Sequence, residues 1–339
     1  MLKELSDLLG VSSQEDDIRQ YIKEKIRPCV QETIEDTYGN LICRVGEPAS
    51  PRIMLAAHMD EVGFMITHID KNGLLRFKPI GLGVQTLLAK PVIIGRQRVP
   101  GVIGCKPIHL AQEEELKKLP ELKTLFIDIG ASSREEGEKS VTIGDCGTFD
   151  TAYRSDGDIL FGKAFDNRIG CYMLIELIRQ HNLSAYYAFT VQEEMGLRGA
   201  RIAGYRVSPD VALAVDTTGS AEWPSDKDLS TSPRIGLGPV LTVTDQSIIC
   251  DRKLVSILEE TARSNSIPYQ FKKPGIGGTD AGQIHLAKGG VPTAVISVCA
   301  RYIHSPMAIA SARDIQDGIR LLALALPAIG AYFRSAEKG

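Results

Sequence analysis

Residues 189–199 read Phe189-Thr190-Val191-Gln192-Glu193-Glu194-Met195-Gly196-Leu197-Arg198-Gly199. The segment before the two acids, Tyr186 to Val191, is apolar and rich in aromatic and β-branched residues, which predicts a buried strand. Such a strand delivers Glu193 and Glu194 to its carboxyl end, where open α/β sheets bind ligands. Because neighbouring strand side chains point to opposite sides, we expect one carboxylate to hold a metal ion and the other to handle a proton. The simpler alternative is a solvated pair of acids at a strand end.

The composition is that of an ordinary soluble globular protein. The chain has 339 residues, 43% of them hydrophobic and 24% charged, and a net charge of −3. This length leaves room for about two domains, and the composition favours neither nucleic acid nor a membrane as a partner. The seven cysteines have no C-x-x-C spacing, and the amino-terminal segment lacks the apolar stretch of a secretory signal. We therefore predict reduced thiols and a cytoplasmic location.

The order of the apolar segments predicts an α/β domain interrupted by a β-rich insertion. Helices are expected at 167–180, at 252–264 and from 312 onward, and they alternate with strands at 186–191, 211–215 and 293–298. From about residue 63 to 151, short strand-like segments alternate with glycine turns instead. The predicted architecture is a three-layer α/β/α catalytic domain, residues 1–62 and 153–339, with an inserted small β-barrel domain at residues 63–152.

Two local features complete this prediction. Ser12 and Glu15 have the spacing of a capping box, which predicts that a helix begins between them and Ile18. The irregular segment from Ser220 to Pro233 is the expected exposed loop.

Acids and histidines stand at five strand ends or strand-following turns of the α/β pattern. These residues are His58 and Asp60, Asp166, Glu193 and Glu194, Asp216, and His304. A lone histidine beside a strand is usually a packing residue, but five such positions in one sheet favour a metal centre. Mixed imidazole and carboxylate ligands suit zinc or a similar transition ion. The period of two places His58 and Asp60 on one face, where the carboxylate can orient a ligating imidazole.

A charge count supports two metal ions. Two divalent cations bring four positive charges, and Asp166, Glu194 and Asp216 supply three negative ones. A bridging hydroxide would make the site neutral. Glu193 is then left over as a base.

Six short motifs are spread over nearly the whole chain. They are Ala57-His58-Met59-Asp60-Glu61-Val62-Gly63-Phe64, Lys163-Ala164-Phe165-Asp166-Asn167-Arg168, Gln192-Glu193-Glu194-Met195-Gly196, Val215-Asp216, Gly277-Gly278-Thr279-Asp280-Ala281 and Arg301-Tyr302-Ile303-His304-Ser305-Pro306. In this order they resemble the motifs of the glutamyl and tetrahedral aminopeptidases, a family of dinuclear metalloenzymes. No departure from the family's metal-site pattern is visible.

The resemblance implies a ligand set for each ion. Asp166 would bridge the two ions, His58 and Asp216 would complete one site, and Glu194 and His304 would complete the other. Zinc is the expected metal, with cobalt or manganese as alternatives.

The resemblance also implies roles outside the ligand set. Glu193 would be the general base and Asp60 the partner of His58, so that peptides are hydrolysed by a metal-bridging hydroxide. The bond between Asp166 and Asn167 would be a cis peptide. The inserted domain would resemble a PDZ fold and mediate dimerisation, and the dimers would assemble into dodecamers that degrade short peptides.

Three other classes of function are compatible with parts of the pattern. A metal-dependent deacylase or carboxypeptidase could use a related dinuclear site, and dependence on a free amino terminus would distinguish it. A glycoside hydrolase could use the pair of acids, but the histidines and Asp216 would then be idle. A noncatalytic metal-binding scaffold would have no use for Glu193 as a spare base.

Overall fold

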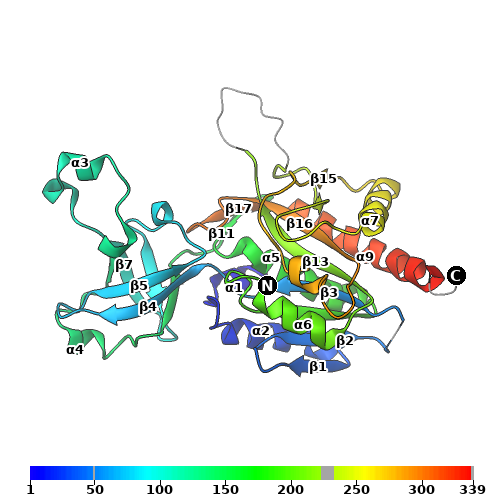
Figure 1. Ribbon diagram of the computed structural model, residues 1–339, viewed down its shortest axis with the longest axis horizontal. Coiled ribbons are helices and arrows are strands. Elements are labelled where there is room, and N and C mark those ends of the chain that lie inside the picture. Colours follow the sequence, from blue (N-terminus) through cyan, green and yellow to red (C-terminus); the bar gives the residue numbers. More distant parts are fainter. Residues whose placement is uncertain (49, 223–232, 337–339) are drawn as a thin grey trace.

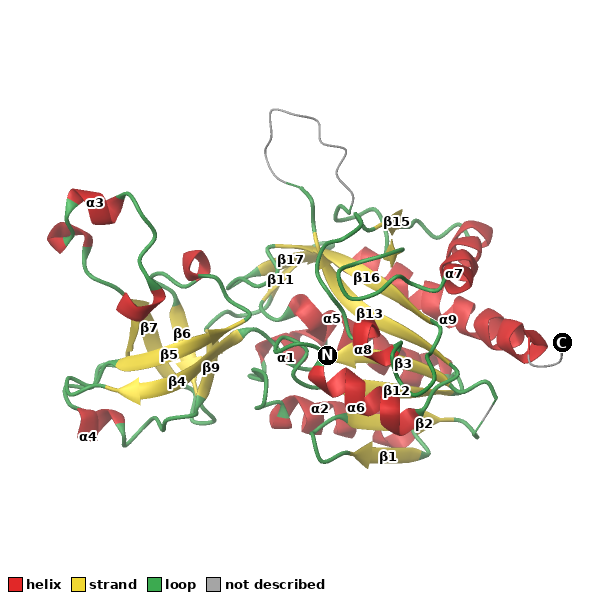
Figure 2. Cartoon of the chain, viewed as in Figure 1, coloured by secondary structure: helices red, strands yellow, loops and turns green. Residues whose placement is uncertain are grey.

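The protein was analysed as a computed structural model that describes residues 1–48, 50–222 and 233–336. It has two parts, a large α/β part and a smaller β-barrel that projects from one end of it (Figures 1 and 2). Most of the segment expected as an exposed loop, residues 223–232, lies outside the described residues. No helix among the described residues is long and apolar enough to cross a membrane.

A mixed sheet forms the centre of the large part. Its main path runs through β1 (Glu32–Glu35), β2 (Leu41–Val45), β12 (Ala185–Thr190), β3 (Ile53–His58), β13 (Val211–Gly219), β16 (Thr293–Arg301), β17 (Ala308–Ser311), β11 (Ile159–Gly162) and β10 (Arg154–Asp156). The short strands β14 (Val240–Thr242) and β15 (Gln270–Phe271) lie off this path. The four central strands, β12, β3, β13 and β16, run parallel to one another. Their carboxyl ends therefore meet at one edge of the sheet.

Helices cover both faces of this sheet because alternate side chains of the strands enter different cores. On β12, Phe189 belongs to the larger core and Ala188 to the smaller one. The larger core is closed by α1 (Leu2–Asp7), α2 (Asp16–Ile26), α5 (Phe165–Glu176), α7 (Arg252–Ser264) and α9 (Ala312–Ala336). The smaller core is closed by α6 (Arg198–Val207) and α8 (Ala281–Ile284). The predicted three-layer α/β/α architecture is confirmed.

The smaller part is a closed antiparallel barrel with a core of its own. Its strands follow the order β4 (Gly63–Ile69), β5 (Leu75–Ile80), β8 (Phe126–Asp128), β7 (Val99–Gly104), β6 (Pro91–Ile94) and β9 (Cys146–Phe149). Phe64 and Phe149 are buried in its centre. The long connection between β7 and β8 carries the short turns η3 (Ile108–Leu110) and η4 (Leu122–Thr124) and the helix α3 (Glu113–Leu116). The predicted fold class is confirmed, and the domain limits 63–152 stay a prediction.

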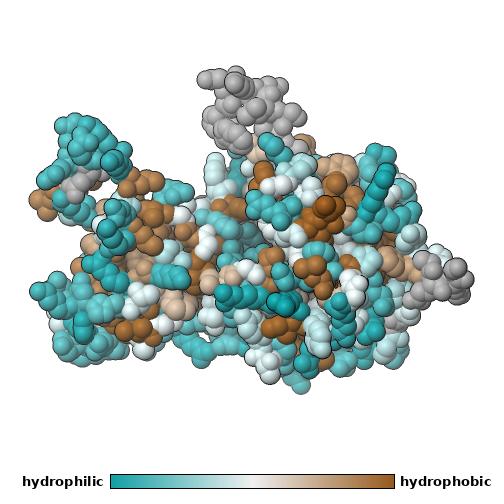
Figure 3. All heavy atoms as spheres, in the orientation of Figure 1, coloured by the Kyte–Doolittle hydropathy of each residue, from teal (hydrophilic) through white to brown (hydrophobic). Residues whose placement is uncertain are grey.

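The surface of the molecule is not uniformly polar. Figure 3 shows apolar side chains exposed on the barrel as well as on the α/β part. All seven cysteines are free thiols.

Buried charges join the barrel to the α/β part. The carboxylate of Glu61, which is only 1% exposed, accepts hydrogen bonds from Lys163 Nζ at 2.7 and 2.8 Å. Arg168 Nη2 lies 3.4 Å from Glu61 Oε1, and the hydroxyl of Thr148 on barrel strand β9 donates to Glu61 Oε2 at 3.0 Å. Gly10 completes the set with a backbone hydrogen bond of 3.1 Å. Glu61 therefore fixes the barrel against the amino-terminal segment and α5.

We expect Glu61→Gln to destabilise the protein by about 3 to 5 kcal/mol, because it leaves the buried Lys163 and Arg168 without their counter-charge. A matched control is Glu32→Gln. It breaks an exposed ion pair with Arg44, and such a pair contributes roughly 0 to 1 kcal/mol. Urea denaturation followed by circular dichroism measures both variants. If Glu61→Gln lowers the free energy of unfolding no more than Glu32→Gln does, this account is contradicted.

Candidate metal centre

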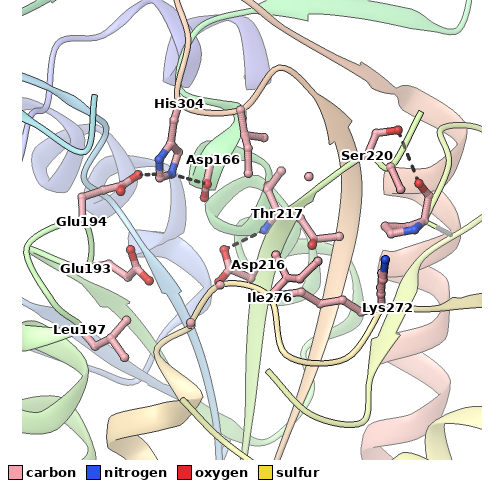
Figure 4. Close-up of a pocket in the computed structure, with 18 of the residues that line it drawn as sticks. Asp166, Glu193, Glu194, Leu197, Asp216, Thr217, Ser220, Lys272, Ile276 and His304 are labelled. Carbon is pink, nitrogen blue, oxygen red and sulfur yellow. Dashed lines mark hydrogen bonds and ion pairs between the residues drawn. The ribbon is translucent and has the colours of Figure 1, made fainter. Parts of the chain in front are cut away.

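The predicted site residues meet at the carboxyl edge of the sheet. His58 ends β3, Glu193 and Glu194 follow β12, and Asp216 lies on β13. Asp166 stands in the first turn of α5, and His304 follows β16. Figure 4 shows all of them except His58, namely Asp166, Glu193, Glu194, Asp216 and His304, on one side of a pocket. Parallel pairing explains the convergence, since Thr190 on β12 lies beside His58 on β3.

The carboxylate of Asp166 lies between the two imidazoles. Its Oδ1 is 3.2 Å from Nε2 of His58, and its Oδ2 is 3.3 Å from Nε2 of His304. Each oxygen therefore faces a different histidine. The peptide bond between Asp166 and Asn167 is cis, which confirms the prediction for this bond.

A further acid lies beside each imidazole. Asp216 Oδ1 is 3.7 Å from Nε2 of His58, and Glu194 Oε1 is 3.3 Å from Nε2 of His304. Glu193 Oε2 is 3.9 Å from the same His58 nitrogen. The donor atoms form two groups whose members lie within 4.8 Å of one another: His58, Glu193 and Asp216, and Asp166, Glu194 and His304.

Asp60 links the first histidine to the pair of acids. Its Oδ1 lies 3.4 Å from Nδ1 of His58. The same carboxylate accepts backbone hydrogen bonds from Glu193 at 3.0 Å and from Glu194 at 3.1 Å. Ser12 donates a further hydrogen bond to it at 2.6 Å. Asp60 is fully buried and so holds the imidazole and the turn after β12 in fixed positions.

Burial of so many acids perturbs their protonation. Burial, with Asp216 and Glu194 nearby, raises the pKa of Glu193 well above its usual range. Burial, reinforced by Asp166, also raises the pKa of Glu194 to about 6. Hydrogen bonds to Asp166 and Glu194 raise the pKa of His304 to about 11. The site therefore has an excess of negative charge that attracts protons or cations.

The site residues fit a divalent metal. Glu194 Oε1 is buried, and its polar contact among the described residues is the ion pair with Nε2 of His304 at 3.3 Å. A buried carboxylate oxygen with so few partners is costly, and a bound cation would lower that cost. The combined imidazole and carboxylate donors suit zinc and similar ions better than calcium or magnesium.

Sequence analysis missed several residues that support the site. The capping-box interpretation is wrong, because Ser12 donates to Asp60 and Glu15 accepts a hydrogen bond from the backbone of Gln192 at 3.1 Å. Both side chains are used at the site instead of within helix α2, which begins at Asp16. Asp280 lies beneath the site and accepts a hydrogen bond from Thr190. Its position in a recognised motif was the only signal for it.

A pocket of about 580 Å³ opens beside the cluster. Asp166, Glu193, Glu194, Asp216 and His304 line one side of it. The remaining walls contain apolar side chains, lysines and backbone from the segments after β13, β15 and β16. The pocket gives a ligand direct access to every predicted site residue except the buried His58 and Asp60.

Comparisons with known proteins identify relatives of nearly the whole chain. Residues 39–321 match the M42 glutamyl aminopeptidase family. A lysyl aminopeptidase of Pyrococcus furiosus is 36% identical over 334 residues, which cover 95% of this chain and 94% of the relative.

Two solved structures are similar over nearly their whole length. The TET aminopeptidase of a marine-sediment Thaumarchaeota archaeon is 36% identical with a TM-score of 0.92, covering 96% of this chain and 94% of that one. The TET1 peptidase of Pyrococcus horikoshii, which can assemble into a tetrahedron or a large octahedral shell, is 33% identical with a TM-score of 0.85. In that comparison 96% of this chain and 98% of the other are covered.

The fold and these similarities define the class of protein as a peptide hydrolase of the aminopeptidase type. Within that class, the chain belongs to the M42 glutamyl aminopeptidase family. The family membership predicted from the six motifs is confirmed.

Proposed function

We propose that this protein is a dinuclear metal-dependent aminopeptidase that removes single residues from the free amino terminus of peptides. The observation that carries the proposal is the position of Asp166, whose two carboxylate oxygens face different imidazoles at 3.2 and 3.3 Å. A second acid stands beside each imidazole, and a pocket opens next to them. This arrangement offers two neighbouring ligand sets that share one carboxylate.

In this proposal Asp166, His58 and Asp216 would hold one ion, and Asp166, Glu194 and His304 would hold the other. Zinc suits these ligands, with cobalt or manganese as alternatives. When bound, such a pair of ions makes a water molecule more acidic and polarises the scissile carbonyl group. Asp60 keeps the ring of His58 oriented through its Nδ1 side.

Glu193 is the proposed general base. Its raised pKa, caused first by burial, suits a group that takes a proton from the attacking water and returns it to the leaving amine. Hydrogen bonding of its backbone N–H to Asp60 holds the side chain at the pocket wall. The competing role is that of a ligand, because Glu193 Oε2 also lies 3.9 Å from Nε2 of His58.

Two isosteric variants separate these roles. We expect Glu193→Gln to retain bound metal but to lose roughly 10²- to 10⁴-fold in turnover, because proton transfer contributes about that much. Glu194→Gln should instead lose metal, because an amide is a weaker ligand than a carboxylate. Elemental analysis after dialysis and the rate of arylamide hydrolysis are measured on both variants. Loss of metal from Glu193→Gln would show that Glu193 is a ligand.

The charge of the site favours a substrate with a free α-ammonium group. The buried acids Glu193, Glu194 and Asp216 leave negative potential at the pocket wall, which an α-ammonium can neutralise. A blocked amino terminus would lose a charge-assisted contact worth roughly 1.5 to 3 kcal/mol. The proposed substrates are therefore peptides with a free amino terminus, in particular short or unfolded ones.

The proposed function is tested by comparing a short peptide with its N-acetylated twin by mass spectrometry. We expect the free peptide to lose residues one at a time from its amino terminus and the acetylated twin to remain intact. Similar cleavage of both peptides would favour the metal-dependent deacylase or carboxypeptidase class instead. A glycoside hydrolase is not favoured, because it leaves the paired histidines without a task.

We also propose that the chain associates with itself through the inserted barrel, first as dimers and then as dodecamers. Apolar side chains are exposed on the barrel (Figure 3). On its β7–β8 connection, Ile108 is 77% exposed and Leu110 is 63% exposed. Two exposed apolar side chains in one short turn favour a contact surface over a solvated loop. The tetrahedral assembly of the Pyrococcus horikoshii relative supports this proposal.

We expect the double variant Ile108→Asp, Leu110→Asp to form smaller particles, because charges at a contact surface oppose association. Light scattering coupled to size exclusion measures the particle mass. The thermal transition of the barrel serves as the control and should stay nearly unchanged, since both side chains are exposed. An unaltered particle mass would exclude this turn from the assembly surface.

A further inference from the structure

Side chains from distant parts of the chain hold the turn that carries Glu193 and Glu194. Every backbone N–H from residue 191 to residue 194 donates to a side-chain oxygen. The acceptors, at 3.0 to 3.1 Å, are Asn40 for Val191, Glu15 for Gln192, and Asp60 for both Glu193 and Glu194. The path of this turn therefore depends on contacts that are distant in sequence.

Gln192 needs such support because its backbone is left-handed. Its φ is +54°, in a region that residues other than glycine rarely adopt. Its N–H donates to Glu15 Oε1 at 3.1 Å, and its side-chain Oε1 accepts a hydrogen bond from the hydroxyl of Tyr38 at 3.0 Å. A costly conformation of this kind persists where the surroundings enforce it. Release of Gln192 would turn the chain immediately before Glu193 and so re-aim that side chain.

Glu15 is a buried acid in an unfavourable environment. It is 4% exposed, and its Oε1 accepts the backbone N–H of Ser13 at 2.9 Å as well as that of Gln192. Burial, reinforced by the nearby Asp60, raises the pKa of Glu15 to about 7. A buried acid beside another acid opposes folding when it is charged, so stability alone does not account for it. Perturbed acids of this kind gather at functional sites.

The loop that carries Glu15 is itself anchored at two further points. Ser12 donates to Asp60 Oδ2 at 2.6 Å. Gln14 Nε2 donates to the backbone carbonyl of the barrel residue Gly144 at 3.3 Å. These contacts hold the carboxylate of Glu15 in a fixed place beside the turn.

We propose that Glu15 is a positioning residue for the reaction, because it fixes the turn at Gln192 and thereby aims Glu193 for proton transfer. The inference rests on the proposed function, in which Glu193 is the general base. Glu15 is not among the described residues that line the pocket, so it acts through the turn and not through a contact with the substrate. It affects turnover more than substrate binding, since a small displacement of a catalytic group can cost about 10²-fold in rate.

The experiment compares Glu15→Ala with Glu15→Gln in the metal-loaded full-length enzyme. Alanine removes the acceptor of the Gln192 N–H, whereas the amide oxygen of glutamine can still accept it. The substrate is whichever arylamide of glutamate, leucine or lysine the wild-type enzyme cleaves fastest, and kcat is expressed per bound metal. We expect Glu15→Ala to lower kcat by about 10- to 100-fold with little change in KM, and Glu15→Gln to keep most of the wild-type kcat.

A double-mutant cycle separates positioning from a general loss of structure. In the Glu193→Gln background the base is already absent, so Glu15→Ala should lower kcat no further. A merely structural role of Glu15 would lower kcat by the same factor in both backgrounds.

Gln14→Ala is the matched control from the same loop. It removes the hydrogen bonds of Gln14 to the barrel, with the Gly144 carbonyl at 3.3 Å and the Cys146 N–H at 3.4 Å, and leaves the acceptors of the turn in place. We expect its kcat to stay close to the wild-type value. Thermal denaturation and elemental analysis show that each variant is folded and contains metal.

The possible failures can be told apart. A wild-type kcat in Glu15→Ala overturns the inference, and so does a Glu15→Gln variant as slow as Glu15→Ala. An equal effect of Glu15→Ala in both backgrounds, or a loss of activity that loss of metal explains in full, overturns it as well. In each of these cases cleavage by the wild-type enzyme leaves the proposed function intact. If the metal-loaded wild-type enzyme cleaves no arylamide and no free peptide, the proposed function itself fails, and this inference with it.

Discussion

The concentration of buried carboxylates at one edge of the sheet is the constraint on which the structure depends. Asp60, Asp166, Glu193, Glu194 and Asp216 lie close together, and the histidines among them in the described structure are His58 and His304. Burial, reinforced by the neighbouring acids, raises the pKa of Glu193 and of Asp216 above their usual values. The parallel pairing of β12, β3 and β13 holds these acids together against their repulsion. A site of this kind is stable when cations bind to it.

Two adjacent acids, Asp60 and Glu61, connect this site to the rest of the molecule. Asp60 contacts His58 and the backbone of the turn after β12. Glu61 contacts Lys163, Arg168 and the barrel residue Thr148. Lys163 and Arg168 flank Asp166 in the sequence, so the same two segments build both the metal centre and the junction with the barrel. The position of the barrel is therefore coupled to the geometry of the site.

Particular residues show how far sequence reasoning reaches. The alternation of strands and helices correctly predicted the helix at Arg252–Ser264 and the start of the last helix at Ala312. The capping box at Ser12 and Glu15 was wrong, because local spacing cannot reveal a competing partner that is distant in sequence. Asp60 and Gln192 are such partners, and their hydrogen bonds override the local motif. Asp280 could be located only by its motif, since nothing in its neighbourhood indicates that it lies under β12.

The sequence by itself determined the fold class, the family and the strand ends that carry acids and histidines. Side-chain periodicity reports which residues are buried and where each strand ends, whereas the family followed from the resemblance of the six motifs. Only the tertiary structure decided that the two oxygens of Asp166 face different imidazoles and that the buried Asp60 contacts both His58 and the turn after β12. Those facts depend on the order and register of strands and on loop packing. These bring together residues more than a hundred positions apart, and no local pattern records such distances.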